Sequence, residues 1–303
     1  MRVLVTGGAG FIGAHVVHAL LDAGHHPVIL DRLDFGVHPL LAGLPLSIIE
    51  GDVTDPDAVV DALDRFDAVI HLAAQISVPF GESHPRQLMA DNVAGTAGAL
   101  ELAEAVGARE FRWASSAAVY GDPQGRLPVT EESTVAPESF YGLSKWAGER
   151  AVDHFGSARS LRTVTLRLAN VYGPGQRTAG EGGVVARFMD RLAEGAPFVR
   201  EGDGQQTRDF IYVGDVARSF VHRLGASPSV LLNIGTGEAT SINRLGELVA
   251  QQGNRSPRWE DAPPRPADIK DSVFDPEPAA FWGFRAETVL AKGLQLTWEH
   301  WRH

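Results

Sequence analysis

The sequence predicts an α/β fold: a Rossmann-type, doubly wound parallel sheet with a smaller C-terminal substrate-binding domain. Two patterns lead to this expectation. Short β-branched runs alternate with helix-length segments through the first half of the chain, and several runs are apolar on both faces, as a sheet covered on both sides requires. After about residue 170, loops rich in glycine and proline take over, which indicates a change of architecture.

The individual elements follow from hydrophobic periodicity. Strands are expected at Val3–Thr6, Val28–Asp31, Ser47–Glu50, Ala68–Leu72, Phe111–Ser115, Thr163–Leu168 and Asp209–Val213. Helices are expected at Phe11–Ala23, Ala58–Phe66, about 86–106, Tyr141–Phe155, Val184–Glu194 and Glu287–Trp301. Residues 256–278 carry six prolines and are expected to be mostly loop. We therefore expect residues 1–168 to form the Rossmann domain, rejoined by about 208–236, and residues 169–303 to form mainly the smaller domain.

Composition narrows the class of protein. The 303 residues carry a formal net charge of −11, which argues against electrostatic binding to nucleic acid or acidic lipid. There is no cysteine, so disulfides and thiolate chemistry are excluded. No apolar run has membrane-spanning length, and the chain enters its first strand too early for a signal peptide. A cytoplasmic protein is expected. The eleven histidines lack metal-ligand spacing, so no metal site is assigned.

A glycine-rich segment, T-G-G-A-G-F-I-G at residues 6–13, lies between a predicted strand and a predicted helix. Glycine permits a tight turn there, and backbone N–H groups at the helix start can bind a pyrophosphate. Asp31 ends the second strand, 18 residues after Gly13. A carboxylate at that place accepts the adenosine ribose hydroxyls and repels a 2′-phosphate. The pattern predicts a site that prefers NAD to NADP, a preference that the adjacent Arg32 slightly weakens.

Two acids in this region have an alternative interpretation. Asp31 could be a strand-end cap in a turn. Asp52 follows the third strand, where its side chain and backbone could meet the adenine edge; an aspartate that opens a helix-capping turn explains it equally well.

Tyr141 and Lys145 lie four residues apart, on one face of a predicted helix. A nearby ammonium stabilises phenolate over phenol, so this tyrosine could act as a general base for an alcohol while hydride leaves the same carbon. Lys145 could also bind the nicotinamide ribose. Ser115 and Ser116 end the fifth predicted strand, at the sheet edge where such folds place active sites. Without these serines as partners, Tyr141 and Lys145 would be interpreted as residues on a solvent-exposed helix face.

Nine motifs, in order, make the chain resemble the extended branch of the short-chain dehydrogenase/reductase superfamily, specifically its nucleotide-sugar epimerase members, typified by UDP-galactose/UDP-glucose 4-epimerase. They occupy residues 6–13, 51–55, 71–78, 92–96, 115–121, 141–145, 167–175, 207–213 and 264–269. Together they span nearly the whole chain.

The resemblance implies the following roles. The catalytic positions are Ser116, Tyr141 and Lys145. The cofactor contacts are Gly7, Gly10, Phe11, Ile12, Asp31, Arg32, Asp52, Val53, Leu72, Ala73, Ala74, Asn92, Tyr141 and Lys145. The substrate contacts are Ser77, Val78, Ser116, Tyr141, Asn170, Arg208, Arg265 and Asp268, with Tyr172 near the pocket.

The two residues after Ser116 bear on the reaction. The related 4,6-dehydratases carry an Asp-Glu pair there, and the decarboxylating relatives keep the glutamate; this chain has Ala117 and Ala118. An elimination needs a base and an acid that alanine cannot supply. The resemblance therefore implies NAD-dependent epimerisation at C4 of a UDP-hexose, by oxidation to the 4-keto sugar and return of the hydride. A 4-ketohexose reductase or dehydrogenase, and a non-catalytic dinucleotide sensor, are the alternatives.

Two departures from the family pattern concern the substrate. Glu201 stands where relatives place an aromatic residue near the base, so the choice between uracil and thymine stays open. Ser272 stands where some hexose epimerases have tyrosine, which would leave room for an N-acetylhexosamine. Relatives also dimerise through helices that correspond to about 92–106 and 141–155, so a homodimer is expected.

Overall fold

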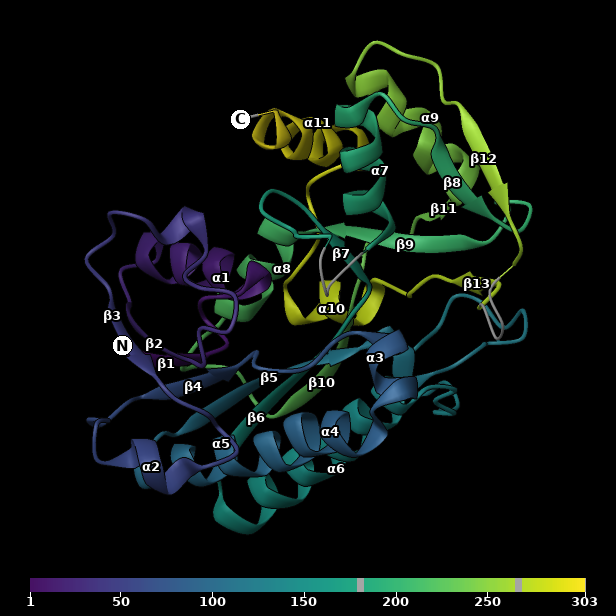
Figure 1. Ribbon diagram of the computed structural model, residues 1–303. Helices are drawn as coiled ribbons and strands as arrows, with labels where there is room; N and C mark the ends of the chain where they lie inside the picture. The colour runs from purple at the N-terminus through teal and green to yellow at the C-terminus, as the bar shows by residue number, and fades with distance from the viewer. Residues whose placement is uncertain (179–182, 265–268, 303) are drawn as a thin grey trace.

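The computed structural model describes residues 1–178, 183–264 and 269–302. Its main sheet has seven parallel strands in the order β10-β6-β5-β4-β1-β2-β3 (Figure 1). The strands are β1 (Arg2–Thr6), β2 (His26–Asp31), β3 (Ser47–Glu50), β4 (Ala68–His71), β5 (Glu110–Ser116), β6 (Arg162–Leu168) and β10 (Val230–Ile234). The strand order reverses beside β1, which has β2 on one side and β4 on the other. Open sheets of this kind bind ligands outside the carboxyl ends of the strands at such a point.

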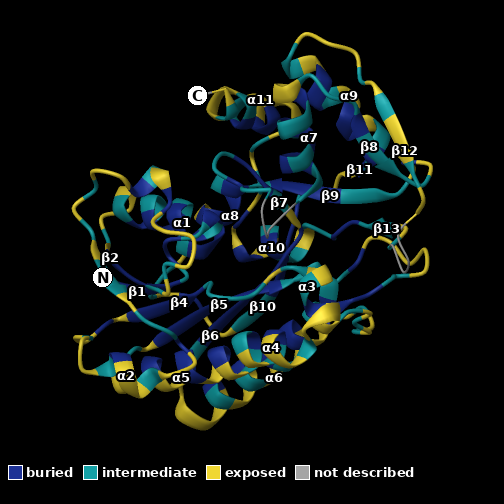
Figure 2. Cartoon of the chain, in the orientation of Figure 1, coloured by how far each residue is buried: buried dark blue, intermediate teal, exposed yellow. Residues whose placement is uncertain are grey.

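Helices cover both faces of this sheet (Figure 1). One face carries α1 (Phe11–Asp22) and α8 (Val213–Val221), and the other carries α2 (Pro56–Val60), α5 (Gly95–Ala105) and α6 (Phe140–Arg159). The central strands are therefore largely buried, as the dark blue arrows of Figure 2 show, whereas the edge strand β3 has no buried residue. In β1, Val3 and Val5 pack toward α1, whereas Leu4 packs into the cluster with α5 and α6. This alternation confirms the doubly wound fold predicted from runs that are apolar on both faces.

Short helical segments connect β4 to β5. They are α3 (Val78–Ser83), α4 (Pro85–Met89) and a π-helical stretch at Ala90–Ala94 that continues into α5. Two 3₁₀ turns, at Pro39–Leu41 and Ala117–Val119, follow β2 and β5. Throughout the described part of the chain, no helix combines the length and apolar composition needed to cross a membrane.

A smaller unit is built from the second half of the chain (Figure 1). In one sheet, β9 (Thr207–Tyr212) pairs with β7 (Asn170–Tyr172), β11 (Ala239–Ser241) and β13 (Asp271–Ser272). In the other, β8 (Phe198–Glu201) pairs with β12 (Trp259–Ala262). The helices are α7 (Val184–Glu194), α9 (Ile242–Gln252) and α11 (Leu290–Trp301). The rings of Phe188 and Phe198 stack 4.7 Å apart, with Trp259 edge-on to both, and form its core.

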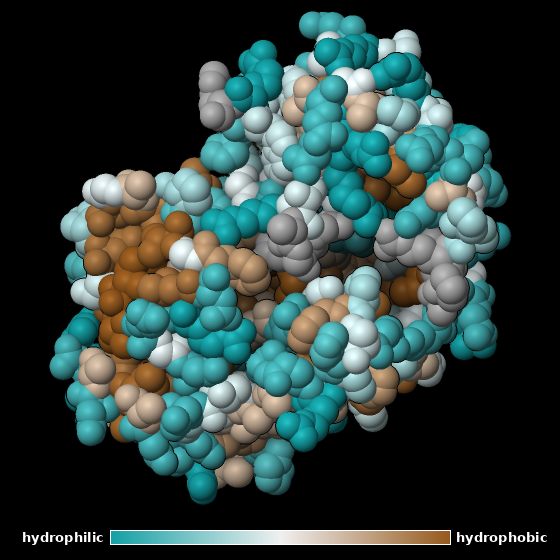
Figure 3. All heavy atoms as spheres, in the orientation of Figure 1, coloured by the Kyte–Doolittle hydropathy of each residue, from teal (hydrophilic) through white to brown (hydrophobic). Residues whose placement is uncertain are grey.

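The two units differ in surface character. On the face seen in Figure 3, hydrophobic residues gather over α1 and the segment between β2 and β3, while the smaller unit presents mainly hydrophilic residues. The chain returns from the smaller unit to the main sheet through α8 and β10, and α10 (Glu277–Trp282) packs against β10.

Three sequence-based boundaries need correction. The helix predicted at Ala58–Phe66 is α2, which ends at Val60. The chain then turns tightly, with hydrogen bonds from Ala62 and Leu63 to the carbonyls three residues before them, and so brings Phe66 into the core. The final helix begins at Leu290 rather than Glu287, because the backbone N–H groups of Glu287 and Thr288 bind the Asp215 carboxylate instead. The segment 256–278 is mostly loop but contributes β12 and β13.

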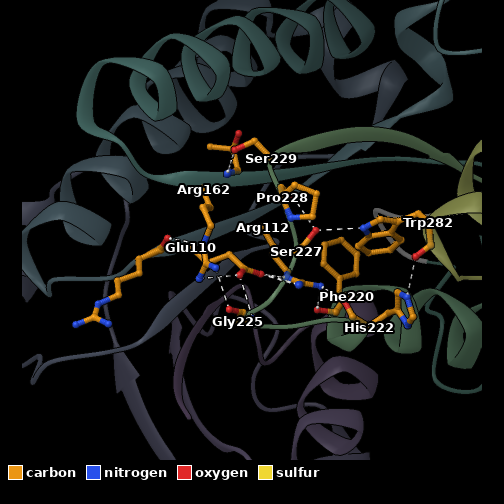
Figure 4. Close-up of polar contacts among 12 residues, drawn as sticks. Glu110, Arg112, Arg162, Phe220, His222, Gly225, Ser227, Pro228, Ser229 and Trp282 are labelled. Carbon is orange, nitrogen blue, oxygen red and sulfur yellow. Dashed lines mark hydrogen bonds and ion pairs between the residues drawn. The ribbon is translucent and has the colours of Figure 1, made fainter.

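A buried ion pair lies where β5 begins, at the sheet edge away from the glycine loop (Figure 4). Glu110 and Arg112 are both fully buried, with Nε and Nη2 of Arg112 each 2.6 Å from Oε1 of Glu110. Arg112 also donates to the carbonyls of Phe220 and His222. Glu110 accepts the N–H of Gly225. The pair therefore ties β5 to the segment between α8 and β10.

Candidate active site

The glycine loop turns between β1 and α1 in a conformation that a side chain would obstruct. Gly7 has φ +68°, and a Cβ on it would lie 2.5 Å from the backbone nitrogen of Ala73. A Cβ on Gly13 would collide with the backbone of Gly7 and Gly8. Gly10 is the N-cap of α1 and places no side chain over the helix start. The residues present therefore fit a pyrophosphate bound by backbone N–H groups.

Asp31 holds this loop from the end of β2. One carboxylate oxygen accepts the N–H of Ala9 (3.0 Å), and the other accepts the N–H of Leu33 (2.9 Å). The adjacent Arg32 guanidinium forms ion pairs with Asp34 (2.9 Å), Asp91 (3.3 Å) and Asp52 (3.5 Å). The positive charge that could have attracted a 2′-phosphate is thus matched by three aspartates, and the pKa of Arg32 is raised although burial acts the other way. Asp52 also accepts the N–H of Thr54, which closes a local turn.

Ser116, Tyr141 and Lys145 meet at the carboxyl end of β5. The helix that carries Tyr141 and Lys145 begins at Ser139, whose hydroxyl caps it by accepting the N–H of Gly142 (3.0 Å). The Ser116 side chain lies close enough to the Tyr141 hydroxyl to favour its ionised form. The Lys145 ammonium donates to the carbonyl of Ala114 (2.9 Å) and lies 5.9 Å from the centre of the Tyr141 ring.

The electrostatics of this trio differ from the expectation. The sequence suggested that Lys145 lowers the pKa of Tyr141. Instead, burial raises the pKa of Tyr141, and the opposing influence is the nearby Ser116 side chain. The Lys145 ammonium is directed to the Ala114 carbonyl. Burial also lowers the pKa of Lys145 to about 8, against the raising effect of the Glu149 carboxylate.

A cavity of about 400 Å³ joins the glycine loop to the trio. Its lining includes residues of the glycine loop, the carboxyl ends of the strands and the loop after β7, so ligands bound at the glycine loop and at the trio would share one space. The predicted residues that line it are Gly7, Gly10, Phe11, Ile12, Asp31, Arg32, Asp52, Val53, Leu72, Ala73, Ala74, Ser116, Tyr141, Lys145 and Asn170.

Other predicted residues lie elsewhere. The Asn92 amide is buried behind the cavity wall, where it bonds the backbone of Gln75 (2.7 and 2.9 Å) and the Ser144 hydroxyl (2.8 Å). It therefore acts through Gln75, which does line the cavity. Ser77 is the N-cap of α3, and Val78 is 41% exposed at that helix start.

The remaining predicted substrate residues belong to the smaller unit. Arg208 lies on β9 and donates to the carbonyl of its neighbour Thr207 (2.8 Å). Arg265 and Asp268 lie outside the described residues. Tyr172 is almost fully buried in the core of the smaller unit, so the expectation that it borders the pocket is wrong; its hydroxyl donates to the Leu290 carbonyl (3.3 Å).

Sequence reasoning did not identify several residues around the cavity. Gln176 lines it, is 8% exposed and has a buried Oε1 that finds no hydrogen-bond partner among the described residues. Phe35 and Asp91 also line it. Gln176 directly follows the motif at 167–175, and this was the sequence signal that could have identified it. No sequence signal indicated Phe35 or Asp91, because their positions depend on how the loop after β2 and the π-helical stretch fold back.

Comparisons with known proteins agree with this geometry. The family model for the "NAD dependent epimerase/dehydratase family" matches residues 3–235. A UDP-glucose 4-epimerase of Mycolicibacterium smegmatis is 36% identical over 312 residues, covering 100% of this chain and 99% of the relative. The crystal structure of Thermus thermophilus UDP-glucose 4-epimerase in complex with NAD has a TM-score of 0.92 at 35% identity, covering 100% of this chain and 99% of the other.

A third protein, UDP-N-acetylglucosamine 4-epimerase of Methanobrevibacter ruminantium in complex with UDP-N-acetylmuramic acid, has a TM-score of 0.92 at 30% identity, covering 99% and 97% of the two chains. The family match spans most of the chain, and the similarity to the epimerases is full-length. The chain is a member of the NAD dependent epimerase/dehydratase family.

Proposed function

We propose that the protein interconverts the C4 epimers of a UDP-hexose, UDP-glucose and UDP-galactose, with NAD as a bound cofactor. The observation that carries the proposal is that two groups of residues line one cavity. The first is the glycine loop with Asp31, and the second is Ser116, Tyr141 and Lys145. The names of the full-length relatives support the same substrate class.

The cofactor would be held by the glycine loop, by Asp31 and by the walls that Asp52–Val53 and Leu72–Ala74 form. When bound, NAD supplies a hydride acceptor that can give the hydride back. Tyr141 removes the proton of the sugar O4 hydroxyl as C4 becomes a ketone, and returns it when C4 is reduced on its other face. Ser116 donates a hydrogen bond to the same oxygen. No net oxidation occurs, so no cofactor is consumed.

The surroundings of Ser116 favour epimerisation over elimination. Ala117 and Ala118 form the 3₁₀ turn that follows it. Neither side chain can remove a C5 proton or protonate a departing hydroxyl, which a 4,6-dehydratase requires. The 4-keto sugar would therefore leave the site only by reduction, and the direction of hydride return decides which epimer forms.

Substrate contacts in the smaller unit belong to the same proposal. The nucleotide diphosphate and the sugar would be held by Asn170, Arg208, Arg265 and Asp268. Ser77 and Val78, at the start of α3, would contact them from the other unit. Ser272 pairs with Arg208 across β13 and β9. Its small side chain, and the similarity to an epimerase of UDP-N-acetylglucosamine, support acceptance of the N-acetylhexosamine forms as well.

We also propose which part of the chain binds each ligand and how the protein assembles. Residues 1–168, with about 208–236, would bind NAD, and residues 169–303 would mainly bind the nucleotide sugar. Phe140, Leu143 and Trp146 follow one another along α6 with 36–39% of each side chain exposed. This apolar stripe supports a homodimer; a Leu143→Glu variant that stays dimeric in sedimentation would argue against this interface. We place the protein in the cytoplasm as part of the same proposal.

The test is incubation of the purified protein with a panel of nucleotide sugars and no added cofactor, followed by sugar analysis. We expect UDP-glucose to be converted partly to UDP-galactose, and UDP-N-acetylglucosamine to its epimer. Product that forms only when NAD or NADH is added, and only in an amount equal to that cofactor, would indicate a dehydrogenase or reductase instead. Absence of any product with bound NAD would indicate a sensor.

A further inference from the structure

A buried network continues from Lys145 along α6 into the sheet. Glu149 lies one helical turn after Lys145, on the same face, and is 1% exposed. Its two carboxylate oxygens accept hydrogen bonds from Nε and Nη2 of Arg167 on β6, at 2.7 and 2.6 Å. The Ser115 hydroxyl on β5 donates to the same carboxylate, at 2.6 Å. The acceptor positions of Glu149 are thus filled by a bidentate guanidinium and a hydroxyl.

The register of the sheet fixes this arrangement. Ser115 and Arg167 are direct partners across β5 and β6, so their side chains leave the same face of the sheet, toward α6. Arg167 is held on its other side, because Nη1 donates to the Tyr120 hydroxyl (2.7 Å), which in turn donates to Asn233 on β10 (2.7 Å). Glu149 is therefore anchored to three neighbouring strands.

Lys145 depends on groups from several elements. Its ammonium contacts the Ala114 carbonyl and lies 5.2 Å from the centre of the Trp113 ring, both on β5. His71 on β4 is fully buried and its pKa is lowered to about 3, so it is neutral and adds no charge. On α6, Tyr141 and Glu149 lie one turn before and one turn after. Glu149 is the negative charge that favours the ammonium in this buried place.

We propose that Glu149 is a positioning residue for the reaction: anchored by Arg167 and Ser115, it keeps Lys145 in the charged form that proton transfer at Tyr141 requires. Along the network the charges alternate, from the tyrosine oxygen that becomes negative, to Lys145, Glu149 and Arg167. The inference rests on the proposed function for its effect on turnover, but the charge of Lys145 can be measured without turnover.

Lysine is rare enough in this chain for a direct measurement. The sequence holds three lysines, Lys145, Lys270 and Lys292. In protein labelled with ¹³C at the lysine ε-carbon, the signal of Lys145 is assigned by its loss in Lys145→Arg, and its chemical shift is followed with pH. The titration is carried out on the protein as purified, with NAD added to saturation.

We expect the titration midpoint of Lys145 to fall by about one pH unit or more in Glu149→Gln, since the variant removes the charge but keeps the shape. In Glu149→Asp the midpoint should return toward the wild-type value. The matched control is Glu110→Gln, which breaks a separate buried ion pair, at the start of β5 (Figure 4), and should leave the midpoint of Lys145 unchanged. In turnover assays, the alkaline limb of kcat should move to lower pH with KM nearly unchanged.

Should Glu149→Gln not fold, Glu149→Gln combined with Arg167→Gln leaves no buried guanidinium without its carboxylate. A lower midpoint is expected there too, by a smaller amount, because loss of the Arg167 charge acts in the opposite direction. A Lys145 midpoint at the wild-type value in the single or the double variant would overturn the proposal, whatever the activity. Failure of the proposed function would look different: no epimer would form in the wild-type protein, while the Lys145 midpoint would still respond to Glu149.

Discussion

Arg177 donates a hydrogen bond from Nη1 to the backbone carbonyl of Phe35, at 2.8 Å, and so joins the loop after β7 to the loop after β2. Two histidines make parallel links: Nε2 of His38 lies 3.0 Å from the Gly175 carbonyl, and Nε2 of His15 lies 3.0 Å from the Pro174 carbonyl. These contacts connect the loop after β7 to the loop after β2 and, through His15, to α1, beside the cavity that would hold the cofactor. They are therefore expected to slow its release.

Loss of these links should shorten the residence time of NAD. We expect Arg177→Gln and His38→Asn each to raise the NAD dissociation rate several-fold, because each removes a tether of about 1 kcal/mol between the loops. His18→Asn is the control, since Nε2 of His18 lies 2.8 Å from the Leu40 carbonyl and so joins α1 to the segment after β2, with no hydrogen bond to the described part of the loop after β7. Dissociation rates can be measured by trapping released NAD with a dehydrogenase. Equal rates in wild type and Arg177→Gln would contradict the tether.

Removal of the Tyr141 hydroxyl should abolish turnover and leave the cofactor in place. We expect Tyr141→Phe to lower kcat by about 10²–10⁴-fold, the usual contribution of a general base. NAD content after gel filtration should match the wild type. Tyr212→Phe is a suitable control, because Tyr212 packs against Tyr172 in the smaller unit. Retained activity in Tyr141→Phe would refute the assigned base.

Two histidines, the buried His71 and the partly buried His15, predict a loss of stability in mild acid. Burial lowers the pKa of His71 to about 3 and that of His15 to about 4, from 6.5. Below pH 6.5 the unfolded chain takes up protons that the folded protein does not, so the free energy of unfolding falls as pH falls toward 4. Each histidine contributes up to about 1.4 kcal/mol per pH unit. Urea unfolding at several pH values measures this slope, which should be smaller in His71→Gln and unchanged in the exposed-site control His26→Gln. A wild-type slope near zero over this range would exclude neutral burial.

The ion pair at the start of β5 should matter to stability rather than to catalysis. Glu110→Gln leaves Arg112 buried with its countercharge gone, and we expect a loss of about 3–5 kcal/mol in the free energy of unfolding. The exposed pair Arg244–Glu247 is the control, where Glu247→Gln should cost less than about 1 kcal/mol. Chemical denaturation of both variants tests this. Similar losses in the two would contradict the role assigned to burial.

The sequence was most informative where a signal is local. Six of the seven strands of the main sheet were predicted within two residues, because β-branched runs bounded by glycine or polar turns are visible without knowledge of partners. β10 was missed: its run at Val230–Ile234 becomes a strand by pairing with β6, from which it is separated by the smaller unit. β8 and β12 escaped for the same reason.

The candidate site shows the same limit. Spacing along the sequence was enough to predict that Tyr141 and Lys145 share one helix face and lie near the end of β5. Residues on one helix face recur at a fixed interval, and the carboxyl ends of parallel strands lie along one edge of the sheet. The direction of the Lys145 ammonium could not be predicted, because it is set by the Ala114 carbonyl. Nor could the role of Glu149, whose partners Ser115 and Arg167 meet it only through the register of two strands.

The most direct test uses UDP-glucose that carries deuterium at C4, given to the purified protein without added cofactor. If the hydride leaves C4 and returns to the same carbon on its other face, the UDP-galactose formed keeps deuterium at C4, and we expect that result. UDP-galactose with hydrogen at C4, or product that forms only with stoichiometric nicotinamide cofactor, would contradict epimerisation by hydride return.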